Sequence, residues 1–322
     1  MRDHGGNIDW AHAEYGGDDW IDLSTGINRV PYPVPPLLPE DWTSLPTRAA
    51  MAGLLAAARQ AYATDAPIVA LAGAQAAIQM IPQLAAPGVA RVLGPTYNEH
   101  AACLRSHGWQ VTEVAALADL AGADLAVVVN PNNPDGQCHT AAALLALVRR
   151  VGRLVVDESF ADARPDLSLA PMAGQEGLLV LRSFGKFYGL AGLRLGFAIG
   201  PGSDIAALAR SAGPWPVSGA AIRIGQAALL DTAWAGTTTI RLRADTLRAD
   251  ALAAQAGWTV AGGCELFRLY DTPEAARAQH RLAQHRIWSR IFPYSGRWLR
   301  LGLPGSDAEW SRLATALDQA AA

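Results

Sequence analysis

The stretch Ser183-Phe184-Gly185-Lys186-Phe187-Tyr188-Gly189-Leu190-Ala191-Gly192-Leu193-Arg194-Leu195-Gly196 decides how the rest of the chain is interpreted. It follows an apolar segment, Leu178 to Arg182, that is typical of a buried strand. Lysine is almost absent from this arginine-rich chain, and the glycines around Lys186 let a ligand approach its amine. Ser183 can donate a hydrogen bond to a phosphate, and Arg194 can bind one through two N–H groups. The stretch therefore predicts a nucleophilic lysine beside a phosphate, whereas an isolated loop lysine would simply be solvated.

Upstream of this stretch, short apolar segments alternate with alanine-rich helical segments. The runs Leu125-Ala126-Val127-Val128-Val129 and Leu154-Val155-Val156 are typical of parallel strands buried on both faces. The pattern predicts helices at 47–63, 74–85, 98–107 and 139–150, and strands at 68–71, 89–93, 109–114, 124–129, 153–157 and 178–182. We therefore predict an α/β fold with a mainly parallel central sheet.

The two ends of the chain differ from this pattern. Residues 1–46 are rich in Gly and Pro, which predicts an irregular arm without a core of its own that belongs partly to a small domain. After the Pro-containing stretch at 213–216, the pattern predicts helices at 218–231, 233–256, 273–285 and 306–321, and strands at 266–270, 287–292 and 298–302. We divide the chain into the arm at 1–46, a large ligand-binding domain at 47–232 and a small α+β domain at 233–322.

Composition excludes several classes of function. The 322 residues are 51% hydrophobic and 17% charged, so the chain can bury a full core. Its 26 Lys plus Arg stand against 29 Asp plus Glu, and this balance predicts no nucleic-acid binding. Three widely spaced cysteines, Cys103, Cys138 and Cys264, predict free thiols and no metal site. No apolar run approaches the roughly 20 residues of a membrane span, and we expect a cytoplasmic protein.

Three further motifs fall where predicted parallel strands end, which is where open α/β sheets bind ligands. They are Ala72-Gly73-Ala74-Gln75, Asn130-Pro131-Asn132-Asn133-Pro134-Asp135-Gly136 and the acid Asp157. Taken singly, each has an ordinary alternative, as a βα turn, a turn or a helix cap. Tyr97 and Arg300 are candidates as well, the alternatives being a core aromatic and a residue at the rim of a strand.

The spacing Ser-x-x-Lys-x-x-Gly-x-x-Gly-x-Arg-x-Gly resembles the lysine signature of the aminotransferase-type, fold type I enzymes that use pyridoxal 5′-phosphate (PLP). The resemblance implies that Lys186 holds the cofactor as a Schiff base. It also implies Asp157 at the ring nitrogen, Asn133 at the phenolic oxygen, Tyr97 stacked on the ring, Ser183, Arg194 and the amides of Ala74 and Gln75 at the phosphate, and Arg300 at the substrate carboxylate.

A finer resemblance comes from His4-Gly5-Gly6-Asn7 and Leu23-Ser24-Thr25-Gly26-Ile27-Asn28, which are similar to the N-terminus of the L-threonine O-3-phosphate decarboxylases of cobalamin biosynthesis. The runs at 95–100, 182–189 and 212–219 fit the same group. This resemblance implies decarboxylation of L-threonine O-3-phosphate to (R)-1-amino-2-propanol O-phosphate, with Lys186, Asp157 and Tyr97 as catalytic residues. It also implies a homodimer, and it makes His4, Gly26 and Asn28 candidates for substrate contact, although an N-terminal His can equally be solvated.

Two other interpretations stay open. An aminotransferase for histidinol phosphate or a similar phosphorylated amino compound would use the same cofactor motifs, because the two reactions differ only in which bond to Cα is broken. A catalytically inactive scaffold with the same fold is the third. The intact set of Lys186, Asp157, Asn133 and Arg194 argues against an inactive protein.

The chain also departs from the wider family pattern at four positions. Phe160 stands where many aminotransferases have a Tyr bonded to the phenolic oxygen, so that hydrogen bond should be missing. Gly185 replaces a Ser that often contacts the phosphate, and Leu45 lies about where many relatives offer a Tyr to the neighbouring subunit. Gly26 replaces an Asn seen in some threonine-phosphate decarboxylases, which makes substrate contact there uncertain.

Overall fold

The structure is a computed structural model that describes residues 4–318, and these residues form two compact units. The large unit comprises Tyr32–Asn133 and Cys138–Ala235. The small unit comprises the described residues up to Pro31, the short segment Pro134–Gln137 and the described residues from Gly236 onward. The domains drawn from the sequence divide the chain after residues 46 and 232 instead. Residues 32–46 thus lie with the large unit.

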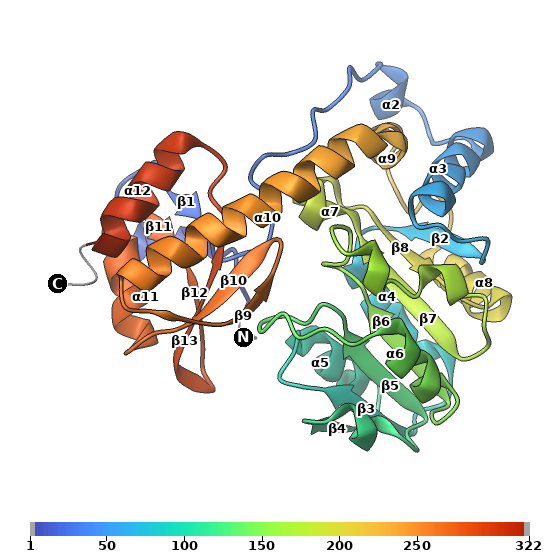
Figure 1. Cartoon of the computed structure of the whole chain (residues 1–322). Coiled ribbons are helices and arrows are strands. Elements are labelled where there is room, and N and C mark those ends of the chain that lie inside the picture. Colours follow the sequence, from blue (N-terminus) through green and yellow to red (C-terminus); the bar gives the residue numbers. More distant parts are fainter. Residues whose placement is uncertain (1–3, 319–322) are drawn as a thin grey trace. The chain divides into compact units, whose positions relative to one another are not determined.

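A seven-stranded sheet forms the centre of the large unit (Figure 1). Its strands are β2 (Ile68–Leu71), β3 (Val89–Leu93), β4 (Gln110–Val114), β5 (Leu125–Val129), β6 (Arg153–Asp157), β7 (Leu178–Ser183) and β8 (Gly196–Ile199). They lie in the order β2-β8-β7-β6-β5-β3-β4, and β8 alone among them pairs antiparallel with both neighbours. The predicted α/β class with a mainly parallel sheet is confirmed.

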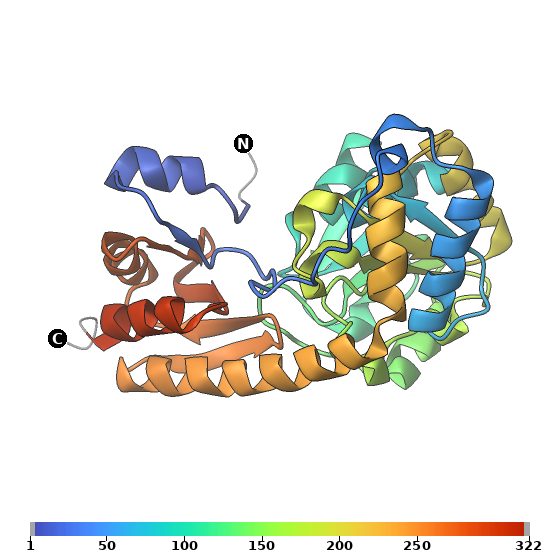
Figure 2. The ribbon, with the colours of Figure 1, turned by 90° about the horizontal axis from the view of Figure 1, so that it is seen from above.

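Helices cover both faces of this sheet (Figure 1). They are α2 (Glu40–Thr43), α3 (Arg48–Ala61), α4 (Ala74–Met80), α5 (Asn98–Ser106), α6 (Ala141–Val148), α7 (Phe184–Phe187), α8 (Gly202–Ala212) and α9 (Gly219–Leu230), with 3-10 turns at Ile81–Leu84, Leu117–Leu120, Pro165–Leu167, Ala170–Met172 and Ala191–Leu193. Thr47, Thr140 and Ser218 cap three of the helices by accepting a backbone N–H. Helices α3 and α9, far apart in sequence, pack side by side (Figure 2).

The packing of the large unit's core explains why the strand sequences consist of consecutive apolar residues. All five residues of β5 are buried, because α4, α5 and α8 pack on one face of the sheet and α6 on the other. Ala90, Val127 and Val155 belong to one continuous apolar cluster. Because both faces of the sheet are buried, polar side chains that contact a ligand are expected at the ends of its strands, and the candidate motifs lie there.

The small unit contains two separate sheets. β1 (Ile21–Asp22) pairs parallel with β11 (Ile287–Trp288), and β9 (Thr259–Cys264), β10 (Phe267–Asp271), β12 (Arg290–Phe292) and β13 (Ser295–Gly302) form an antiparallel sheet in the order β12-β13-β10-β9. Its helices are α1 (Ile8–Tyr15), α11 (Ala275–Gln284) and α12 (Asp307–Asp318), together with most of the long helix α10 (Thr232–Gln255).

Several sequence-based predictions for this unit were wrong. The expected irregular arm contains α1 and contributes Ala11, Leu23 and other buried residues to the core. The single strand expected at 287–292 divides into β11 and β12, which belong to different sheets. The predictions also omitted β9 in the small unit and, in the large unit, β8 and α8. Glycines interrupt the apolar pattern at the start of β8 and within β9. For the helix expected at 306–321 the structure describes Asp307–Asp318, and the rest of that range lies outside the described residues.

Candidate active site

A cavity of about 240 Å³ lies in the large unit beyond the carboxyl ends of β5, β6 and β7 and beside the start of α4. All eight residues expected to contact the cofactor line it: Ala74, Gln75, Tyr97, Asn133, Asp157, Ser183, Lys186 and Arg194. Its apolar wall includes Ile78, Val129 and Leu195. The fold therefore brings together motifs from five separate segments, while the role of each residue stays a prediction.

Lys186 is the only lysine in the whole chain. It lies on the short helix α7, immediately after β7, and its side chain is half-buried. Its Nζ atom is 5.8 Å from the centroid of the Phe160 ring, which also lines the cavity. A Cβ atom at Gly185 would stand 2.7 Å from the Cα of Ala191, so this turn requires glycine before the lysine. Packing accounts for the glycine that stands where relatives have serine.

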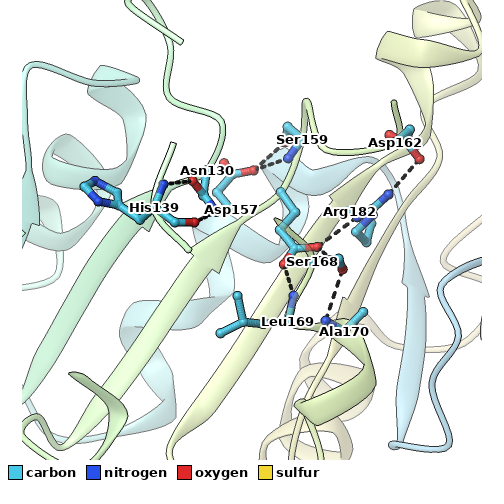
Figure 3. A network of polar contacts seen from close by, with 10 residues as sticks. Asn130, His139, Asp157, Ser159, Asp162, Ser168, Leu169, Ala170 and Arg182 are labelled. Atoms are coloured by element: carbon cyan, nitrogen blue, oxygen red, sulfur yellow. Dashed lines mark hydrogen bonds and ion pairs between the residues drawn. The ribbon is translucent and has the colours of Figure 1, made fainter. Parts of the chain in front are cut away.

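Asp157 ends β6 with an exposure of 2%. Its Oδ2 lies 2.8 Å from Nε2 of His100, and its Oδ1 accepts hydrogen bonds from the backbone N–H and the hydroxyl of Ser159 (Figure 3). Burial by itself would raise the pKa of Asp157, but the hydrogen bonds from His100 and Ser159 outweigh it and lower that pKa. The carboxylate is therefore held in its charged form inside the protein.

Several hydrogen-bond donors of the cavity lining lie where Arg194 meets the turn before α4. Arg194 adopts a left-handed backbone conformation with φ of 53°, and its Nη1 donates to the carbonyl of Ala191 at 3.1 Å. A Cβ atom at Gly73 would stand 2.8 Å from Nη2 of Arg194, so the guanidinium lies directly against the turn that opens α4. The first N–H groups of a helix have no acceptor within that helix. Ser183, Arg194 and the amides of Ala74 and Gln75 thus present donors to one end of the cavity.

The loop that carries Asn133 is braced by its neighbours. Asn130 donates from its side chain to the carbonyl of His139 and accepts from the His139 N–H, while its own N–H donates to the carbonyl of Asp157 (Figure 3). The Thr96 hydroxyl donates to Oδ1 of Asn132 at 2.6 Å. These contacts hold the loop between β6 and the segment that precedes α5.

A buried ionic network lies behind the strand ends. Arg182 donates at 2.8 Å to both Glu158 and Asp162 (Figure 3). Its guanidinium lies 4.4 Å from the centroid of the Tyr62 ring. The Ser168 hydroxyl and the Leu169 N–H also donate to Glu158. Burial raises the pKa of both carboxyls, although Arg182 opposes the shift in each. The network links the segment after Asp157 to the strand that leads to Lys186.

The four remaining predicted residues lie in the small unit. Arg300, in β13, has an exposure of 3%, and its Nη2 donates to the carbonyl of Ser24 at 2.6 Å. Burial, followed by the charge of Arg290, lowers its pKa to about 9. The side-chain oxygen of Asn28 accepts from Val30 N–H and from Arg241, so this amide helps to hold the small unit together. Gly26 is buried and His4 is exposed.

A second cavity of about 230 Å³ lies within the small unit. Its lining comprises His4, Gly5, Asn7, Trp10, Ser24, Gln279, Trp288, Ser289, Arg290 and Ile291. The sequence analysis singled out His4 but not Arg290, because a lone arginine on a short strand has no local signal. With an arginine, two serines and a histidine, the lining suits an anion such as a phosphate monoester.

Two residues of the segment before and within α5 also escaped the sequence analysis. Glu99 and His100 stand two and three residues after Tyr97, in the first turn of α5, and both are buried. Their closeness in sequence to Tyr97, a cavity residue, is the signal that could have identified them, because consecutive side chains in the first turn of a helix face different neighbours.

Within residues 4–318, no group of three His, Cys, Asp or Glu side chains could hold a metal ion. No helix of that described range is long and apolar enough to cross a membrane.

Comparison with known proteins gives a consistent result. The family model of class I and II aminotransferases matches residues 44–317. A threonine-phosphate decarboxylase from Pseudomonas aeruginosa is 42% identical over 98% of this chain and 97% of its own length, and one from Sinorhizobium is 43% identical over the same shares. The histidinol-phosphate aminotransferase of Sinorhizobium meliloti, solved in complex with pyridoxal-5′-phosphate, shares the fold with a TM-score of 0.80 at 20% identity, covering 97% of this chain and 94% of that one.

Proposed function

Because the chain belongs to the class I and II aminotransferase family, a family of PLP enzymes, we propose that it decarboxylates L-threonine O-3-phosphate with that cofactor. The product is (R)-1-amino-2-propanol O-phosphate, a precursor for the side chain of cobalamin. The observation that carries the proposal is the identity of more than two-fifths, over nearly the full length, with two threonine-phosphate decarboxylases.

The cavity of the large unit fits PLP in the chemistry of its donors. One end offers Ser183, Arg194 and the first amides of α4 to a phosphate, and the other offers a buried, charged carboxylate to a protonated ring nitrogen. The only amine among the chain's side chains, Lys186 Nζ, faces the same cavity as Asn133 and Tyr97. We assign these residues to hold the cofactor as the sequence analysis predicts.

Bound PLP supplies an electron sink that accepts the electron pair left when a bond to the substrate Cα breaks. Asp157 keeps the ring nitrogen protonated, because its own pKa is lowered and it stays charged at neutral pH. Lys186 then delivers a proton to Cα after carbon dioxide has left. The apolar side chains of Ile78, Val129 and Phe160 exclude water from this proton transfer.

The residues that we assign to the substrate lie in the small unit. We assign Arg300 to the substrate carboxylate, since a buried guanidinium whose pKa is lowered gains most from an anionic partner. The second cavity, with His4 and Arg290, has the composition to bind a phosphate monoester. Asn28 and Gly26 stay candidates for the substrate region.

We also propose that the protein is a cytoplasmic homodimer. Three large apolar side chains of the large unit, Trp42, Leu45 and Trp215, are exposed by 68%, 64% and 54%. Apolar side chains that are so exposed are common where subunits meet. Light scattering at micromolar concentration tests the assembly: a mass of one chain would contradict it.

The aminotransferase for histidinol phosphate remains the alternative function, because the cofactor residues serve both reactions. Phosphorus NMR of holoenzyme incubated with L-threonine O-3-phosphate separates the two. Formation of aminopropanol phosphate without a keto acid supports the proposal, whereas a product that forms only with 2-oxoglutarate contradicts it.

Borohydride reduction, followed by peptide mapping, tests whether Lys186 holds the cofactor as a Schiff base. The reduced cofactor should be found on Lys186, and K186A should retain none.

A further inference from the structure

A buried carboxylate with no role in the proposed chemistry stands directly behind the cofactor cavity. Glu99 has an exposure of 6% and lies in the first turn of α5, where the helix dipole favours a negative charge. Its Oε2 accepts a hydrogen bond from Nε2 of Gln75 at 3.2 Å. Gln75 lines the cavity, and Glu99 is absent from its lining. Any effect of Glu99 on the cavity therefore passes through a neighbouring residue such as Gln75.

The contact of Glu99 decides how the Gln75 amide is oriented. Oε2 of Glu99 accepts this hydrogen bond, so the Gln75 amide turns its NH₂ group toward Glu99. The Oε1 of Gln75 is then directed to Tyr97, whose hydroxyl donates to it at 3.1 Å. Without the carboxylate, either end of the amide could face Tyr97. The acceptor oxygen of Glu99 thus sets the orientation in which the Tyr97 hydroxyl donates to Gln75.

The same contact fixes the place of an aromatic ring in the cavity wall. Tyr97 is held at its hydroxyl by Gln75, and its ring packs edge-on against His100 with centroids 6.1 Å apart. His100 is in turn bonded to Asp157. We infer that Glu99 is a positioning residue, which fixes the Tyr97 ring against the cofactor through the Gln75 side chain. The inference rests on the proposed function, because it presumes that PLP occupies the cavity.

The test compares E99Q, Y97F and the double variant as holoenzymes. E99Q keeps the volume of the side chain but offers the Gln75 amide both a donor and an acceptor, and Y97F keeps the ring but removes the hydroxyl. Visible circular dichroism reports how asymmetrically the lysine-bound cofactor is held, and equilibrium dialysis gives its Kd. E99Q should weaken the dichroic band and raise the Kd about 3- to 10-fold, the range expected for one hydrogen bond.

The double variant separates positioning from general damage. In the Y97F background, E99Q should change the Kd by less than about twofold, because the hydroxyl through which Glu99 acts is gone. D204N is the matched control: Asp204 has an exposure of 6% and pairs with Arg153 at 2.8 Å, away from the cavity lining. It should destabilise the fold without changing the dichroic band.

Three outcomes would overturn the inference: E99Q resembling the wild type, E99Q acting equally in the Y97F background, or D204N changing the dichroic band as much as E99Q does. A wild-type protein that binds no PLP at Lys186 would instead contradict the proposed function. The two failures are therefore distinguishable in one set of measurements.

Discussion

Nε2 of His100 lies 2.8 Å from Oδ2 of Asp157, and both side chains are buried. This pair keeps a carboxylate charged at a place where burial alone would neutralise it. An Asp with a lowered pKa stabilises the fold at all pH values above its ordinary value near 3.8, and this contribution is lost as the pH falls through the lowered value. Asp157 therefore contributes to the stability of the fold at neutral pH as a charged carboxylate.

Replacing His100 tests this relationship. H100F keeps an aromatic ring of similar size but removes the hydrogen bond, so burial should then raise the pKa of Asp157. We expect a loss of about 1–3 kcal/mol in unfolding free energy at pH 7, the cost of an unsatisfied buried polar group. The acid limb of kcat/KM should move to higher pH. An unchanged acid limb in H100F would show that His100 does not control the charge of Asp157.

The buried network around Arg182 predicts a large and pH-dependent loss of stability. R182M removes the cation that two buried carboxyls share, and we expect it to cost about 3–5 kcal/mol. Because burial raises the pKa of Glu158 and Asp162, the loss should be greater at pH 8 than at pH 5, where protonation relieves the unpaired charge. Urea unfolding at the two pH values measures it.

A matched control for that prediction is the exposed pair of Arg105 and Glu113, whose nitrogen and oxygen are 3.0 Å apart. R105M should cost less than about 1 kcal/mol, because solvent screens the pair. Equal losses in R182M and R105M would show that the buried network contributes little.

The presence of Phe160 in the cavity leads to a prediction about the pH at which the lysine-bound cofactor titrates. Its ring centroid lies 5.8 Å from Lys186 Nζ and carries no hydroxyl, so we expect the phenolic oxygen of the bound cofactor to lack a donor at this position. F160Y should lower the pH at which the absorbance of the lysine-bound cofactor titrates, because a donor stabilises the deprotonated form. F160L is the control and should not lower it. A titration in F160Y that coincides with the wild type would sink the prediction.

The three cysteines should differ in reactivity. Cys138 is exposed, whereas Cys103 and Cys264 are buried, and burial raises the pKa of Cys264 to about 12. Iodoacetamide at pH 8 should therefore modify Cys138 in the native protein and all three after unfolding. Mass spectrometry of the peptides reads this out, and rapid labelling of native Cys264 would contradict the buried position.

The cofactor cavity was predictable from the sequence because its residues sit at the ends of strands with clear apolar runs. Strand β5, for example, is buried throughout, and the motif at Asn133 follows it directly. Parallel strands bring such ends to one edge of the sheet, so motifs far apart in sequence had to meet. The eight residues expected there do line one cavity.

Contacts that depend only on tertiary packing could not be predicted from the sequence. Nothing local marks Glu99 as a partner of Gln75 or His100 as a partner of Asp157, because these contacts join α5 to a separate helix, α4, and to a separate strand, β6. Helix α1 was not predicted, because the many Gly and Pro residues in the surrounding sequence favoured an irregular segment over a helix. Its stability comes from burial of Ala11 against Ala283 and Trp288, which no local pattern reveals.

The most direct test of the account measures carbon dioxide from L-threonine O-3-phosphate labelled with ¹³C in its carboxyl group. Holoenzyme without any keto acid should release one labelled CO₂ for each aminopropanol phosphate formed, and K186A should release none above background. Retention of the labelled carboxyl in a keto product, formed only when an amino acceptor is present, would contradict the central claim.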